Sequence, residues 1–102
     1  MDLQKLMQQA QEMQAQMQRA QEELAKETVE ASAGGGMVSV TATGALEIKE
    51  IKISPEAIDS EDPELLADMV VAAVNEALRS AKSLMESKLG SAMGGLGGLP
   101  GM

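Results

Sequence analysis

The chain has 102 residues, of which 44% are hydrophobic, and it contains no Cys, His, Phe, Tyr or Trp. That composition excludes disulfides, thiol or imidazole catalysis, and nearly all zinc, copper and haem sites. The net charge of −8, from 16 acidic and 8 basic residues, argues by itself against nucleic-acid binding, because domains that bind nucleic acids usually carry a basic patch.

Length predicts one domain, with a core made of aliphatic side chains only. A short chain without aromatic residues buries little apolar area alone, so a second subunit is expected to supply the rest. The absence of a signal segment or of a run of about 18 apolar residues predicts a cytoplasmic protein that does not contact membranes. No spacing places a base beside a nucleophile, so we expect no enzymatic activity, small-molecule substrate or cofactor.

The first 27 residues are predicted to form a helical arm, with the helix itself over residues 2–26. Gln, Glu, Ala, Met and Leu are strong helix formers, and the segment has no Gly or Pro. A rod of this length measures about 37 Å, whereas a 100-residue domain has a radius of gyration of about 13 Å, so the arm must project or lie along a partner. Its apolar positions alternate three and four residues apart, as in a coiled-coil seam: Leu3, Leu6, Ala10, Met13, Met17, Ala20 and Leu24.

Residues 28–53 are predicted to form a three-stranded antiparallel meander. Gly34–Gly36 make the first turn and Gly44 marks the second. The apolar phase changes within the third strand, which predicts a bulge near Lys49 and Glu50.

The second half of the chain is predicted to be a short turn and a long helix. Residues 54–58 form one helical turn, and residues 62–89 form the helix, which Gly90 ends. Residues 90–102 form a flexible Gly/Met-rich tail. Helix capping explains most of the acidic residues before this helix, so we expect no metal site at Asp59, Glu61, Asp62 and Glu64.

The element order predicts an α+β fold with the C-terminal helix packed on one face of the sheet. The other face, or the sheet edge, is expected to meet a second copy in an intertwined or sheet-joined homodimer with projecting helical arms. The candidate interface residues are Met37, Val38, Val40, Leu46, Ile48, Ile51, Ile53, Met13 and Met17.

Three segments resemble the YbaB/EbfC family of bacterial nucleoid-associated proteins, and they cover residues 1–90 in the expected order. The segments are MDLQKLMQQAQEMQAQMQ, GGGMVSVTATGALEIKEIKISPEAID and LLADMVVAAVNEALRSAKSLMESKLG. The resemblance implies a cytoplasmic homodimer of α-β-α layout, whose helical arms contact duplex DNA in the nucleoid. It also implies a contribution to chromosome organisation and gene regulation.

Six basic residues are candidates for contacts with DNA phosphates. Residues 79–89 hold three basic groups against Glu86, a local net charge of +2, and three further basic groups lie along the arm. A competing interpretation is that those near the end of the C-terminal helix only complement its dipole and stay solvated, and that Arg19 and Lys26 form ion pairs with Glu22, Glu23 and Glu27. The candidates are Arg79, Lys82, Lys88, Arg19, Lys26 and Lys5.

The way in which DNA would be recognised also follows from the composition. Without aromatic side chains to stack on bases, we expect backbone contacts to double-stranded DNA with low or shape-based sequence specificity. The alternative function is a homodimeric adaptor whose Met/Leu-lined arms bind a protein partner, or pair with each other. The salt dependence of binding distinguishes these two functions, because the affinity for DNA phosphates falls steeply as salt is added and the affinity of an apolar protein interface does not.

Overall fold

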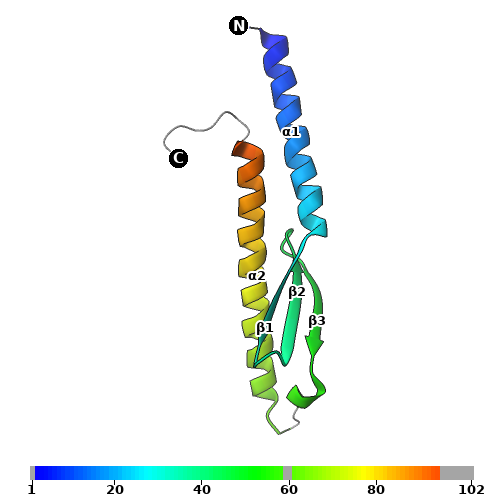
Figure 1. Ribbon diagram of the computed structural model, residues 1–102, viewed down its shortest axis with the longest axis vertical. Coiled ribbons are helices and arrows are strands. Elements are labelled where there is room, and N and C mark those ends of the chain that lie inside the picture. Colours follow the sequence, from blue (N-terminus) through cyan, green and yellow to red (C-terminus); the bar gives the residue numbers. More distant parts are fainter. Residues whose placement is uncertain (1, 59–60, 95–102) are drawn as a thin grey trace, which may run out of the picture.

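The computed structural model describes residues 2–58 and 61–94, and it confirms the predicted α+β fold (Figure 1). An antiparallel meander in the order β1-β2-β3 lies between two long helices in the chain; in space, the C-terminal helix runs along the sheet and the N-terminal helix extends beyond one end of it. The molecule measures 71 × 27 × 16 Å, with a radius of gyration of 19.6 Å, so the long arm does project. None of the described helices is long and apolar enough to cross a membrane. The elements are α1 (Leu3–Lys26), β1 (Thr28–Ala33), β2 (Val38–Thr43), β3 (Ile48–Ile53), the 3₁₀ turn η1 (Pro55–Ala57) and α2 (Pro63–Gly94).

The helix starts follow the capping residues. The Ser54 hydroxyl accepts a hydrogen bond from the Glu56 N–H, with Pro55 at the first position of η1. The Asp62 carboxylate accepts one from the Leu65 N–H at 3.2 Å, which begins α2. No three acidic side chains in the described ranges come together as a possible metal site.

The end of α2 differs from the prediction, because the helix continues through Gly90 to Gly94. A glycine inside a helix costs only about 1 kcal/mol relative to alanine, and the Ala and Met that follow it favour helix. The predicted flexible tail is therefore helical at its start, and its last part, residues 95–102, lies outside the described residues.

The strand register explains the change of apolar phase in β3. Thr41 pairs with Glu50 and Ala42 pairs with Ile48, so Lys49 is the extra residue of a bulge. The predicted bulge is confirmed. Its consequence is that Ile48 lies on the same face of the sheet as Ile51 and Ile53, because cross-strand partners share a face.

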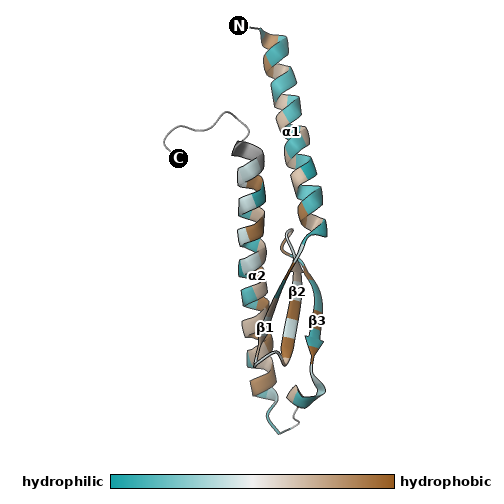
Figure 2. Ribbon diagram, in the orientation of Figure 1, coloured by the Kyte–Doolittle hydropathy of each residue, from teal (hydrophilic) through white to brown (hydrophobic). Residues whose placement is uncertain are grey.

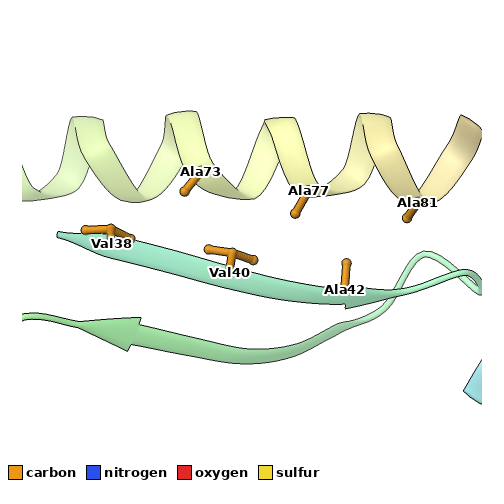
Figure 3. Packing of buried hydrophobic residues seen from close by; sticks show 6 residues of the cluster. All are labelled: Val38, Val40, Ala42, Ala73, Ala77 and Ala81. Atoms are coloured by element: carbon orange, nitrogen blue, oxygen red, sulfur yellow. The ribbon is translucent and has the colours of Figure 1, made fainter. Parts of the chain in front are cut away.

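The core is built from small side chains where α2 crosses β1 and β2 (Figure 3). Alanines at every fourth residue of α2 form one ridge, which lets the helix approach the sheet closely. Val38 and Val40 are 0% exposed in this cluster, so the prediction that they lie at a dimer interface is wrong: they pack against α2 of their own chain. The buried cluster comprises Val38, Val40, Ala42, Ala73, Ala77 and Ala81.

Helix α2 covers only part of the apolar face of the sheet. It packs on β1 and β2, whereas Ile48, Ile51 and Ile53 of β3 share that face and stay exposed. The opposite face carries polar residues such as Glu30, Ser39 and, on β3, Lys52, so it is not the apolar surface that the sequence suggested for a second copy. Most of α1 is hydrophilic, and β2 is mainly hydrophobic (Figure 2).

Replacing Gly44 with Ala is expected to lower the free energy of unfolding by about 1–3 kcal/mol, as overpacking does. An added Cβ would lie 2.6 Å from Leu24 Cδ2 and 2.9 Å from the Leu24 carbonyl oxygen, where α1 ends against the turn after β2. Gly90→Ala is the matched control, because nothing lies within 4 Å of its added Cβ. Urea unfolding should show Gly90→Ala equal to the wild type or up to about 1 kcal/mol more stable; equal effects of the two changes would contradict the packing argument.

Candidate nucleic-acid interface

Helix α1 and the second half of α2 extend beyond the same end of the sheet and run alongside each other (Figure 1). Ala20 and Leu24 of α1 are buried there, and the Gly44 N–H donates to the Glu27 carbonyl oxygen at 3.0 Å. The first half of α1 extends further from the sheet, and its Leu3 and Leu6 are exposed. The arm therefore has an anchored second half and a free first half.

Lys88 of α2 holds the anchored half of α1 through two carboxylates. Its Nζ donates to Glu27 Oε1 at 2.6 Å and to Glu23 Oε2 at 2.9 Å, and only 25% of its side chain is exposed. The hydrogen bonds to Glu27 and Glu23 raise the pKa of Lys88 above its ordinary value of 10.5. The hydrogen bond and charge of Lys88 lower the pKa of Glu23 below 4.5. Lys88 is thus engaged within the protein and is not free for DNA phosphates.

Replacing Lys88 with Met is expected to loosen α1 from α2 and to lower the free energy of unfolding. The lowered pKa of Glu23 means that its contribution is present above pH 4.5 and is lost as the pH falls through the lower folded-state value. The raised pKa of Lys88 means that its contribution is present below pH 10.5 and is lost as the pH rises through the higher folded-state value. Urea unfolding across pH should show the largest gap between wild type and variant within these limits.

Lys82→Met is the matched control for this change. Lys82 lies on the same helix, is exposed and forms no ion pair within the described part of the chain. Its replacement should leave the free energy of unfolding near the wild-type value. A gap for Lys88→Met that stays constant as the pH falls to about 2, where carboxylates are protonated, would contradict the ion-pair account.

Two basic residues of α1, close in sequence to the carboxylates that bind Lys88, form no direct ion pair within the described residues. Glu22, Glu23 and Glu27 were the expected competitors for Arg19 and Lys26. Glu23 and Glu27 bind Lys88 instead, and no ion pair of Glu22 is present within the described residues, although Glu22 lies between Arg19 and Lys26 on the helix. Within the described residues, neither Arg19 nor Lys26 forms an ion pair. The competing interpretation for the arm residues, that they are occupied in ion pairs on their own helix, is not what the structure shows.

These residues form one stripe along α1, which we call the basic stripe: Lys5, Arg19 and Lys26, with Glu12 between the first two. The four positions 5, 12, 19 and 26 are seven residues apart. They therefore share one side of the helix, and each lies about 10 Å from the next along the helix axis. The stripe carries three positive charges and one negative, a net of +2. It points away from the buried Ala20 and Leu24, because Arg19 comes one residue before Ala20 and Lys26 two residues after Leu24, which turns the stripe roughly a third of the way round the helix from them.

The basic residues of α2 are less available than the sequence suggested. Arg79 donates to Glu76 at 2.6 Å, although 68% of its side chain is exposed. Lys82 shares its side of the helix with Arg79 and Glu86, so two basic residues stand among two acidic ones. With Lys88 bound elsewhere, the local excess of +2 counted along the sequence is absent from this surface.

Sequence reasoning did not find Glu23 and Glu27 as the partners of Lys88. They lie 65 and 61 residues from it, and nothing in the spacing of either helix indicates which turns of α1 and α2 meet. The seven-residue interval of the basic stripe, in contrast, could have been found from the sequence. The interval was overlooked because acidic residues outnumber basic residues in this part of the sequence.

Comparisons with known proteins agree over nearly the whole chain. The model of the YbaB/EbfC DNA-binding family matches residues 1–96. A nucleoid-associated protein of Acetivibrio thermocellus is 56% identical over 95% of this chain and 86% of its own length. A nucleoid-associated protein of Streptomyces avermitilis is 50% identical over 99% of this chain and 91% of its own length. In structure, the uncharacterized protein HP0035 from Helicobacter pylori is similar, with a TM-score of 0.77 and 25% identity over 95% of this chain and 99% of that one.

Proposed function

This chain belongs to the YbaB/EbfC DNA-binding family, and on that premise we propose that it binds duplex DNA through the basic stripe of α1. Membership confirms the resemblance predicted from the sequence, and with it a DNA-binding function in the nucleoid. The observation that carries the assignment to the stripe is the bond of Lys88 to Glu23 and Glu27. That bond engages two of the three acidic residues beside Arg19 and Lys26, and the positive charge of Lys88 offsets one of their two negative charges, so Arg19 and Lys26 keep their side chains free of direct ion pairs within the described residues.

An acidic protein can bind DNA in this way because affinity depends on local contacts with phosphates, not on net charge. The stripe has a net charge of +2, whereas the whole chain has −8. The acidic remainder repels DNA from the other surfaces and so directs the duplex to the arm. Lys82 and Arg79 of α2 are secondary contacts, since an exposed ion pair such as that of Arg79 is weak enough to exchange for a phosphate.

The binding unit that we propose is a homodimer joined through β3. Ile48, Ile51 and Ile53 continue the apolar face that α2 covers on β1 and β2, and β3 is an edge strand with unpaired backbone groups. Leu46, at the turn before β3, is exposed and has a φ of 65°, a conformation that is costly for leucine. Contact with the second copy would explain why a bulky apolar side chain occupies this exposed and strained position.

Recognition in this arrangement is through the DNA backbone. The basic stripe provides only Lys and Arg from one exposed helix side, and the chain has no aromatic residue to stack on a base. Contacts of this kind position the protein without reading base edges. We therefore propose low sequence specificity, with any preference arising from the shape of the duplex.

The test is fluorescence anisotropy of a labelled duplex of about 30 base pairs, titrated with protein from about 25 to 200 mM salt. Saturable binding is expected, with log affinity falling linearly against log salt by about 0.9 for each phosphate contact. A second duplex of unrelated sequence and equal length should bind within a few fold. No binding at the lowest salt, from protein shown to be folded, would overturn the proposal.

A further inference from the structure

The apolar seam of α1 is covered over only half of its length. Ala20 and Leu24 are buried where the helix meets α2 and the sheet, and Met17 is partly covered. The first four seam positions, Leu3, Leu6, Ala10 and Met13, are exposed, and Met7 beside them is 58% exposed. We call Leu3, Leu6, Ala10 and Met13 the open seam.

The charges around the open seam are arranged so that a second copy is not repelled. The positions that flank a coiled-coil seam decide which partners are accepted, and the four flanking positions between Leu6 and Met17 carry no charge. The charged residues of this stretch, Lys5 and Glu12, each follow one seam residue by two positions and precede the next by one, so they point away from the seam, and their charges cancel. The flanking residues are Met7, Gln9, Gln14 and Gln16.

We propose that the open seam pairs with the open seam of another molecule and so links one DNA-binding unit to the next. The chain has a net charge of −8, which opposes contact between copies at most surfaces, and residues 3–18 form a neutral exception with one Lys and one Glu. A segment that is apolar on one side and uncharged at its flanks is complementary to itself. DNA is not the occupant, because the open seam offers no donor to a phosphate.

The interface proposed here is distinct from the one at β3. The open seam lies on the free half of the arm, beyond the buried Ala20, whereas Ile51 lies on the sheet. On α1 itself, the seam and the basic stripe point to different sides, so one arm can pair with another arm while its stripe remains accessible. Pairing of arms would then bring two duplexes together. The proposal does not rest on DNA binding, because the association is measured without DNA.

Analytical ultracentrifugation from about 5 μM to about 1 mM protein tests the association, since two heptads support only weak binding. The wild type is expected to increase in mass above its basic unit as the concentration rises. Leu6→Glu with Met13→Glu should abolish that increase and leave the basic unit intact. Gln8→Glu with Gln11→Glu adds the same charge on the other side of the helix, and should keep the increase.

A third variant tests the proposal in the opposite direction. Ala10→Leu enlarges the central side chain of the open seam and should strengthen association at least about tenfold, because a leucine at a seam position buries more apolar area. Circular dichroism establishes that each variant keeps the helix content of the wild type. A wild type of constant mass over the whole concentration range would overturn the proposal, as would equal behaviour of the two Glu pairs.

Discussion

Replacing Arg19 and Lys26 with Gln is expected to weaken binding to a 30-base-pair duplex by at least about tenfold at 50 mM salt, because each lost phosphate contact removes counterion release. Both residues lie on the basic stripe and form no ion pair within the described residues. A dimer loses two contacts from each chain, so the slope of log affinity against log salt should become shallower by up to about 4. The measurement is the same anisotropy titration that tests the proposed function.

The control for that variant is Lys49→Gln with Lys52→Gln. It removes the same two charges and likewise changes the net charge of the chain from −8 to −10. Lys52 lies on the sheet, away from the arm, with its Nζ 3.7 Å from Oε1 of Glu50. If both pairs of substitutions weakened binding equally, net charge and not the basic stripe would control the affinity, and the assignment of the interface to α1 would be wrong.

Replacing Ile51 with Glu is expected to separate the proposed dimer, raising its dissociation constant at least about a hundredfold. Covering one isoleucine contributes about 1.5–3 kcal/mol, and an unpaired carboxylate in its place adds a further cost of burial. Because Ile51 is exposed in the single chain, the substitution should leave the fold of that chain intact. Sedimentation measures the mass, and the anisotropy titration should show weaker binding, since a monomer presents only one arm.

Ser39→Glu is the matched control for the dimer. Ser39 lies on the polar face of the sheet, and its cross-strand partner is Lys52, which can accept the added charge. This variant should remain a dimer and bind DNA as the wild type does. A monomeric Ser39→Glu variant, or a dimeric Ile51→Glu variant with normal circular dichroism, would place the interface elsewhere.

Local features of this fold were predictable because they depend on residues that are neighbours along the chain. The hydroxyl of Ser54 and the carboxylate of Asp62 begin their helices within a few residues. The change of apolar phase in β3 predicted the position of the bulge, because side chains alternate between the two faces of a strand and one extra residue restores Ile48 to the face of Ile51 and Ile53. The end of α2 was predicted too early, because the helix propensity of the residues around Gly90 outweighs the destabilisation of the helix by one glycine.

The candidate site was predicted less completely. The basic stripe was present among the six candidates, but Lys88 was included with them although it binds Glu27. Val38 and Val40 were assigned to a dimer because alternation identifies an apolar face without showing what covers it. In each case the error concerns the partner of a side chain, and the partner lies on a distant part of the chain.

The sequence by itself therefore determined the helices and strands, the side on which each carries its apolar residues, and the membership of a DNA-binding family. Only the tertiary structure decided that α2 covers two strands and leaves β3 open, and that Lys88 binds Glu23 and Glu27 at the end of α1. The physical reason is the range of the interactions. Periodicity and capping act within one or two helical turns, whereas the pairing of charges and the covering of a sheet depend on which surfaces meet after the chain has folded.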